Sequence, residues 1–306
     1  MLGMIRRILN KIESIYKYKY LAQNEDGAYQ FILKNVFKNT DIDFIEKAFQ
    51  LDYFRQILVP QKIDFSNLRK VLVLAPHQDD EVIGCGGVLL RLKELNAEVQ
   101  IIFLTDGKEM SNQESSVEIR TKEAKEVGKF LGAKIKNLAI DNVSLQIENH
   151  HIKQLETWIN EDFDAIFTVW PLDNPPKHRL CSFLTGKVFE NLSLVNTPVY
   201  LYSVHTDLMP NFYEDITDLI DMKQKIIKMY PSQMQVQRYD HLSLGLDAWR
   251  TRFLPVSNEI RYIETFCKIP VKSYVDFQNI YKQENVNILF KGHETCIESF
   301  KRLKKM

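Results

Sequence analysis

The sequence predicts an α/β fold in which a mostly parallel sheet carries helices on both of its faces. Two observations support this prediction. Short, continuous apolar runs alternate along the chain with longer segments whose apolar residues recur at helical spacing. The first run, Lys70–Pro76, is apolar at every position after the lysine and ends in proline, which is typical of a strand buried on both faces. Strands that alternate with helices favour a parallel sheet covered on both sides.

The elements follow one another in a regular order. Strands are expected at five apolar runs: 70–75, 99–104, 135–140, 165–170 and 198–204. Helices are expected between them, around 88–95, 119–131, 152–159 and 180–192, with Gly132 as the C-terminal stop of the second. A further amphipathic helix is expected over 216–230, ended by Pro231.

The pattern divides the chain into three segments. Residues 66–235 form the α/β domain. Residues 1–65 are expected to be a mostly helical N-terminal extension. Residues 236–306 are weakly periodic and are expected to be a C-terminal extension that packs on the same domain and helps to shape a substrate cleft.

Composition excludes several classes of protein. The 306 residues include 40 Lys plus Arg and 40 Asp plus Glu, so no net charge attracts nucleic acid. No apolar run approaches the ~18 residues of a membrane span, and the first residues do not resemble a signal peptide. The four cysteines are scattered, which argues against a disulfide framework. A cytoplasmic location is therefore expected.

Residues 1–20 are more basic than the rest of the chain. They carry five basic residues and one acid, and their apolar residues recur at helical spacing, which predicts a basic amphipathic helix. One interpretation is a helix docked on the main domain with a solvated basic face. The other is peripheral contact with an anionic membrane surface.

The residues after the first strand indicate a metal site. His77, Asp79, Asp80 and Glu81 lie within five positions, and ligands of parallel sheets bind at the carboxyl ends of the strands. Neighbouring buried carboxylates need a cation, and a divalent metal bound by His and carboxylate supplies one. His77 and Asp80 can converge on one ion, with Asp79 close to it but not bound. The alternative is that these acids cap the following helix.

A third ligand is expected because a catalytic zinc site usually has three protein ligands and one open position. His178 follows the strand expected at 165–170 and is the best candidate, since it lies at the same end of the sheet as His77. His205 follows the next strand and lies on the same rim. The nearby glycines Gly84, Gly86 and Gly87 do not have the spacing of a dinucleotide-binding loop.

Residues 75–81, Ala-Pro-His-Gln-Asp-Asp-Glu, resemble the PHPDDE signature of the PIG-L/LmbE-like family of zinc-dependent N-deacetylases. Residues 173–178 resemble that family's D-x-H-x-D-H segment, and residues 230–233 resemble its Tyr-x-Ser-Gln stretch. The resemblance covers roughly residues 70–235. It implies a Rossmann-like fold and an N-acetylated sugar or sugar conjugate as substrate.

The resemblance also implies a role for individual residues. One zinc ion per chain would be bound by His77, Asp80 and His178. Zinc lowers the pKa of a bound water molecule toward ~7, and Asp79 would take its proton as general base. Two further residues would contact the substrate: Arg120 and Asp106.

The second segment departs from the family pattern at two positions. Pro175 stands where the family has its first histidine, and Lys177 stands where it has an acid. Lys177 could supply positive charge near the oxyanion, or His205 could occupy the space of the missing histidine. If neither does, the alternative function is a catalytically weak family member that binds a carbohydrate or serves as a scaffold.

Overall fold

The computed structural model describes residues 8–12, 59–109, 113–173, 175–192 and 197–283, together with 298, 301–302 and 305 near the C-terminus. The chain forms two units, residues 1–51 and residues 52–306. In the first unit, residues 8–12 are helical and exposed. The remainder of the basic helix expected over 1–20, and residues 13–58 of the expected extension, lie outside the described residues.

Among the described residues of the second unit, eight strands form one sheet in the order β1-β7-β8-β6-β5-β2-β3-β4. Neighbouring strands are parallel, except that β8 is antiparallel to both β6 and β7. In chain order the strands are β1 (Gln61–Lys62), β2 (Lys70–Ala75), β3 (Glu98–Thr105), β4 (Lys134–Ile140), β5 (Ala165–Val169), β6 (Pro198–Tyr202), β7 (Phe212–Asp215) and β8 (Ile263–Pro270).

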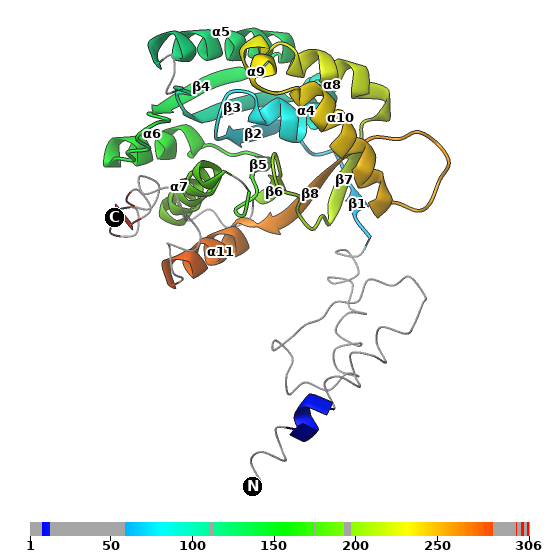
Figure 1. Ribbon diagram of the computed structural model, residues 1–306. Coiled ribbons are helices and arrows are strands. Elements are labelled where there is room, and N and C mark those ends of the chain that lie inside the picture. Colours follow the sequence, from blue (N-terminus) through cyan, green and yellow to red (C-terminus); the bar gives the residue numbers. More distant parts are fainter. Residues whose placement is uncertain are drawn as a thin grey trace. The chain divides into compact units, whose positions relative to one another are not determined.

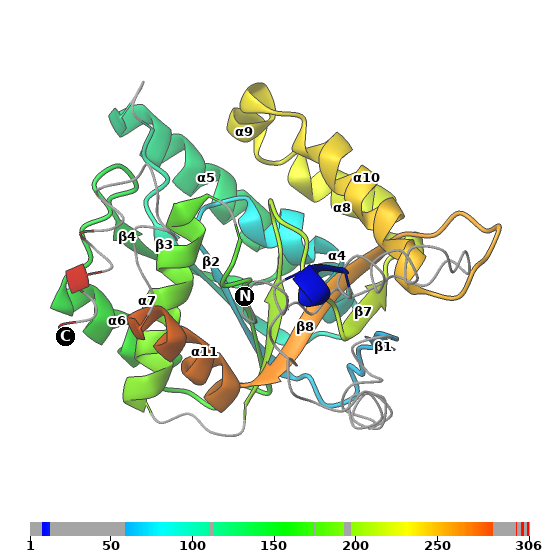
Figure 2. The same cartoon turned by 60° about the horizontal axis from the view of Figure 1, so that its bottom comes forward.

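Helices cover both faces of this sheet (Figures 1 and 2). On one face lie α4 (Asp80–Glu94), α5 (Gln113–Leu131), α8 (Ile220–Ile227), α9 (Pro231–Val236) and α10 (Tyr239–Arg250). On the other lie α6 (Asn149–Ile159), α7 (Pro176–Leu192) and α11 (Val271–Gln283). Two short 3-10 helices, η1 (Thr217–Leu219) and η2 (Thr251–Phe253), precede α8 and follow α10. The predicted α/β fold with a mostly parallel sheet is confirmed.

The central strand β2 shows why the apolar run gives this fold. Val71 and Val73 pack in the core under α4 and α8, whereas Leu72 and Leu74 pack in the core under α6 and α7. Because successive side chains of a strand point to opposite faces, a strand covered on both faces must be apolar at every position. The continuous run at 70–75 meets this requirement.

The five predicted strands are confirmed as β2 to β6, but the sheet extends beyond residues 66–235. β1 pairs with β7, and β8 inserts between β7 and β6, so both expected extensions supply a strand. The prediction of one continuous helix over 216–230 was wrong. The structure has η1, α8 and a break, and Pro231 begins α9, because proline fits the first turn of a helix. No helix within the described ranges has the length and apolarity of a membrane span.

Candidate metal centre and active site

Two loops at the carboxyl ends of β2 and β5 bring the candidate ligands together. The loop after β2 is pinned to β3, since the backbone N–H and the hydroxyl of Thr105 both donate to the Pro76 carbonyl. It carries His77, and Asp80 begins α4 directly after it. His178 lies in the first turn of α7, after the loop that follows β5. The two loops are adjacent because β2 and β5 are parallel neighbours in the sheet.

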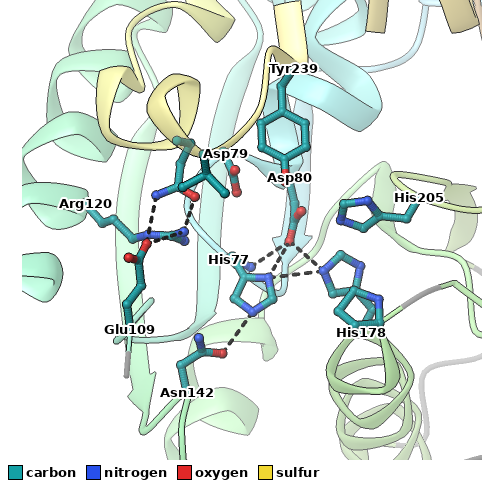
Figure 3. A pocket seen from close by; sticks show the side chains of 12 residues that line it. His77, Asp79, Asp80, Glu109, Arg120, Asn142, His178, His205 and Tyr239 are labelled. Atoms are coloured by element: carbon teal, nitrogen blue, oxygen red, sulfur yellow. Dashed lines mark hydrogen bonds and ion pairs between the residues drawn. The ribbon is translucent and has the colours of Figure 1, made fainter. Parts of the chain in front are cut away.

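Three side-chain atoms converge at this point (Figure 3). His77 Nδ1 lies 3.1 Å from Asp80 Oδ2 and 3.1 Å from His178 Nε2, and His178 Nε2 lies 3.3 Å from Asp80 Oδ2. Ligands at ~2.0–2.1 Å from a tetrahedral zinc ion lie about 3.3 Å from one another. The three atoms therefore have the separations of one face of a zinc coordination sphere. Within the described ranges, these residues are the group whose geometry suits a metal ion.

Outer hydrogen bonds fix the orientation of both imidazole rings. The Nε2 atom of His77 lies 2.9 Å from the Asn142 Oδ1 atom, and the Nδ1 atom of His178 lies 2.9 Å from Asp173 Oδ2. Both partners are acceptors, since the Asn142 amide nitrogen already donates to the Lys108 carbonyl. The outer ring nitrogens thus carry the protons, and the inner nitrogens present lone pairs.

This donor set fits a cation. In this tautomeric state two nitrogen lone pairs and one carboxylate oxygen face each other at contact distance, an arrangement that repels itself unless a positive charge lies between them. Burial alone would raise the pKa of Asp80, but its contacts with His178 and His77 hold the pKa well below its usual range, so Asp80 is present as a carboxylate. His77, Asp80 and His178 could therefore hold a divalent metal ion, with Asn142 and Asp173 as its outer partners.

Asp173 connects the ligand helix to the neighbouring strand. It is fully buried, and its carboxylate accepts hydrogen bonds from the backbone N–H groups of Val204, His205 and Thr206 as well as from His178. Burial would raise the pKa of Asp173, but these hydrogen bonds lower it. Asp173 is thus held as an anion, which lets it accept the His178 Nδ1–H.

Asp79 lies beside the three ligands and is held in an unusual conformation. Its φ of 132° lies in the region that residues with a Cβ atom rarely adopt. It occupies the N-cap of α4, but its side chain makes no capping hydrogen bond, so helix capping does not account for it. Burial, together with the charge of Asp80, raises the pKa of Asp79 well above its usual range. Strain of this kind is found at functional sites.

Glu81 fixes the backbone at this position. Its carboxylate accepts the Asp79 backbone N–H at 3.0 Å and the Tyr230 hydroxyl at 2.5 Å. Glu81 is fully buried, and burial raises its pKa to about 7. Tyr230, at the N-cap of α9, therefore ties the C-terminal helices to the loop that carries Asp79.

A cavity of about 290 Å³ opens over these groups. Arg120 of α5 lies on the wall of the cavity opposite His77 and His178 (Figure 3). Its Nη2 atom donates to Gln233 Oε1 and lies 3.4 Å from Glu109 Oε1. Arg120 is buried, and its Nε atom has no hydrogen-bond partner. The cavity is lined by His77, Asp79, Asp80, Glu109, Arg120, Asn142, Pro175, His178, His205, Gln233, Val236 and Tyr239.

The remaining residues expected in the site are divided between the cavity and its supports. His205 lines the cavity, with its ring centroid 5.3 Å from that of His178. Lys177 and Asp106 are not among the described residues that line it. Lys177 Nζ donates to the Asn142 carbonyl at 2.7 Å, and Asp106 Oδ1 accepts the backbone N–H groups of Lys108 and Asn142. Both residues therefore contact the loop that carries Asn142.

Three further polar residues line the cavity without any signal in the sequence. Asn142 follows β4, Glu109 follows β3 and Tyr239 begins α10, and none of them belongs to a recognisable motif. Figure 3 shows the Tyr239 ring directed toward Asp80. Asp173 and Gln233 lie in the stretches that resemble family motifs, but nothing in those stretches indicated their partners.

The glycines after the motif serve close packing. A Cβ atom at Gly84 would collide with the Tyr202 ring, and one at Gly87 would collide with Ile216. Because both residues lie in α4, they allow this helix to approach the sheet and η1 closely, which positions its first residue, Asp80, over the carboxyl end of β2. The glycines thus have a structural role that does not involve a nucleotide.

Comparison with known proteins agrees with this site. Residues 72–189 match the family model PIG-L, described as GlcNAc-PI de-N-acetylase. Diacetylchitobiose deacetylase of Thermococcus kodakarensis is 28% identical over 223 residues, which are 64% of this chain and 80% of that protein. Residues 72–189, which match the family model, include the loops after β2 and β5 that hold the three candidate ligands.

Solved structures show the same fold. N,N'-diacetylchitobiose deacetylase from Pyrococcus horikoshii, in complex with its inhibitor, superimposes with a TM-score of 0.60 at 28% identity, over 77% of this chain and 96% of that one. GalB, the 4-carboxy-2-hydroxymuconate hydratase of Pseudomonas putida, shares the fold at 19% identity with a TM-score of 0.56, over 66% of this chain and 96% of that one.

The fold and the His-Asp-His cluster define an α/β protein with a candidate metal site at the carboxyl end of its sheet. Residues 72–189, which include the three candidate ligands, are similar to the PIG-L family of de-N-acetylases, and the two diacetylchitobiose deacetylases resemble the chain at 28% identity.

Proposed function

We propose that the protein is a zinc-dependent hydrolase that removes the acetyl group from an N-acetylated sugar or sugar conjugate. The observation that carries this proposal is the convergence of His77 Nδ1, Asp80 Oδ2 and His178 Nε2 beside the Asp79 carboxylate, which makes no capping hydrogen bond to α4. Two proteins that are 28% identical to this chain are named as deacetylases of diacetylchitobiose. The cavity of about 290 Å³ is close to the ~300 Å³ lower end of small-ligand pockets, which suits a single sugar residue with its acetamide.

His77, Asp80 and His178 would hold one zinc ion per chain. When bound, the ion would polarise the acetamide carbonyl and lower the pKa of water toward ~7. Asp79, whose burial favours the protonated carboxyl group, would take a proton from water at its carboxylate oxygen. Arg120, held between Gln233 and Glu109, would bind a substrate oxygen through its guanidinium group.

The departing amine needs a proton. Two residues were expected to compensate for the family histidine replaced by Pro175: His205 and Lys177. His205 lines the cavity, whereas Lys177 donates to the Asn142 carbonyl. We therefore assign proton delivery to His205, and we assign Lys177 and Asp106 to holding the Asn142 loop rather than to contacts with the substrate.

The test combines metal content with acetate release from N,N'-diacetylchitobiose and from N-acetylglucosamine. The parent protein should contain about one zinc per chain, and His178→Ala and Asp80→Ala should lose it. Asp79→Asn should retain the metal and lose about 10²–10⁴-fold in rate, since only the proton acceptor has been removed. Asp221→Asn, an exposed carboxylate on α8, is the matched control and should retain both.

Two results would contradict the proposal. A parent protein that binds no zinc after loading would show that the three atoms do not form a metal site. A parent that binds one zinc but releases no acetate from any N-acetylated sugar would favour the binding or scaffold protein, because Pro175 and Lys177 would then have removed a group that turnover needs.

A further inference from the structure

The helix α10 buries charged and polar side chains and exposes two large apolar ones. Its buried face carries Asp240, Ser243, Asp247 and Arg250. On its outer face Leu242 is 45% exposed and Trp249 is 61% exposed. These two are seven positions apart, and so lie on one side of the helix. An ordinary surface helix buries its apolar residues and exposes its charges, so the solvent-facing side of α10 requires an explanation.

Charge inside the domain explains the buried face. Lys223 of α8 is fully buried and its Nζ atom lies 2.5 Å from Asp247 Oδ2 and 2.8 Å from Glu264 Oε1. Arg250 also lies in this region, with its Nη1 atom 3.7 Å from Asp247 Oδ1. Asp247 and Arg250 of α10 belong to this buried ion cluster, and two apolar residues of the same helix, Leu242 and Trp249, face outward, whereas Leu244, Leu246 and Ala248 are partly buried.

The exposed apolar residues continue on both sides of α10. Val236, just before the helix, is 67% exposed and also lines the candidate active-site cavity. After η2, the loop 255–261 is closed by a hydrogen bond from Arg261 Nη2 to the Pro255 carbonyl. At the tip of this loop Val256 is fully exposed and Ile260 is 81% exposed. We call the set Val236, Leu242, Trp249, Val256 and Ile260 the α10 surface.

The charges around the α10 surface are mainly positive. Between residues 228 and 261, the charged side chains that are not buried are four cations and one acid: Lys228, Arg238, Arg252, Arg261 and Glu259. Lys228 and Arg238 pair with the buried Asp240, which leaves Arg252 and Arg261 as the cations that face Glu259 alone. The guanidinium of Arg252 lies over the Trp249 ring, 4.7 Å from its centroid. Protein surfaces that enter the headgroup region of a bilayer combine exposed aliphatic side chains with tryptophan and arginine.

We infer that the α10 surface docks the protein onto an anionic lipid membrane. Exposed apolar groups of this extent mark an interaction site, and the positive rim selects a negatively charged partner. The N-terminal segment of the same chain does not meet this condition, since residues 1–20 carry five basic residues and one acid. A second copy of the α10 surface would bring the same cations together, so it is the less favourable partner. Since Val236 belongs to both the α10 surface and the cavity lining, docking places the cavity mouth close to the headgroups.

The test measures vesicle binding of the full chain, without substrate, so its result is independent of the proposed deacetylase activity. Vesicles of phosphatidylcholine with phosphatidylglycerol should shift the emission of Trp249 to shorter wavelength, and brominated lipids should quench it. Trp249→Phe should remove both changes, which separates the signal from Trp158 and Trp170. Vesicles of phosphatidylcholine alone should have little effect.

The paired substitution Val256→Asp with Ile260→Asp should lower the bound fraction at least about tenfold, because two aliphatic side chains leave the interface and two negative charges enter it. Neither residue is packed in the fold, so stability should not change. Ile119→Asp, at an exposed apolar position on α5, is the matched control and should bind like the parent protein.

Two outcomes would overturn the inference. One is Trp249 emission that does not respond to saturating anionic vesicles. The other is a paired variant that binds vesicles as well as Ile119→Asp does. If light scattering then shows that the paired substitution dissociates an oligomer, the α10 surface is a contact between copies of the chain.

Discussion

At the scale of single residues, the orientation of two imidazole rings decides whether the site can hold a metal. In both His77 and His178, one ring nitrogen donates a hydrogen bond to an outer acceptor and the other ring nitrogen faces Asp80. The acceptors differ in kind, since Asn142 is a neutral amide and Asp173 is a buried carboxylate. The carboxylate should contribute more, because it raises the basicity of the histidine that it orients.

We therefore expect Asp173→Asn to weaken zinc binding about 10- to 100-fold while leaving all three ligands in place. Competition with a chromogenic chelator measures the affinity, and circular dichroism verifies that the variant is folded. Asp79→Asn provides the contrast, since Asp79 makes no hydrogen bond to a ligand side chain and its replacement should leave the affinity unchanged. Equal affinities for the parent protein and Asp173→Asn would show that His178 is oriented by packing alone.

The candidate ligands could be predicted because each lies in a short motif directly after an apolar run. The rule that parallel strands end at one edge then placed His77 and His178 together. Asn142, Glu109 and Tyr239 could not be predicted in this way, since they come from loops and a helix whose approach depends on the complete fold. The contacts of Lys177 and Asp106 with the Asn142 loop could not be predicted either, because the sequence places these residues near the rim but does not give the direction of their side chains.

At the scale of elements, α10 shows the limit of hydrophobic periodicity. The spacing of apolar residues identifies two faces of a helix but does not say which one is buried. The buried face of α10 is polar because Asp247 forms an ion pair with Lys223 inside the domain, and Lys223 also pairs with Glu264. β8 was missed for a related reason. Its fully buried first half contains Glu264 and Thr265, so it lacks the continuous apolar run that reveals β2.

The first turn of α10 should respond to pH. Hydrogen bonds from Arg238 lower the pKa of Asp240 from 3.8 to about 2. A carboxyl group whose pKa is lower in the folded state stabilises the fold above its unfolded pKa, and this contribution is lost as the pH falls toward the folded value. Asp240→Asn should thus cost up to about 1 kcal/mol at pH 7, since Arg238 is exposed, and progressively less below pH 4.

Urea unfolding at pH 7, 4 and 3 measures this difference. Asp276→Asn, an exposed carboxylate on α11, should show no comparable dependence. A cost of Asp240→Asn that is the same at all three pH values would mean that the side chain acts through its shape and not its charge.

At the scale of the whole domain, one buried ion cluster joins four elements that are far apart in the sequence. Lys223 of α8 contacts Asp247 of α10 and Glu264 of β8. Glu264 in turn accepts the backbone N–H groups of Gly87 and Val88, directly after the break in α4 at Cys85. The C-terminal part of the chain is therefore bound to the helix that begins at the candidate metal site.

Lys223→Met should destabilise the domain by about 3–5 kcal/mol, because it leaves the buried Glu264 without a cation and leaves Asp247 with Arg250 alone. Replacing Asp247 as well, in Lys223→Met with Asp247→Leu, should recover part of this loss, since one buried carboxylate is removed and Glu264 keeps its bonds to α4. Free energies of unfolding from urea titration provide the comparison. A loss below about 1 kcal/mol for Lys223→Met would show that water or protonation compensates the cluster.

The backbone of Asp79 has a consequence for the design of stabilised variants. Glycine at position 79 would relieve a conformation that costs roughly 1–3 kcal/mol and would remove a buried carboxyl group, so the folded state would gain stability. The same change would delete the carboxylate proposed as the general base. Stability and the proposed turnover therefore place opposite demands on this position, and a search for stabilising substitutions that measures folding alone would select Asp79→Gly.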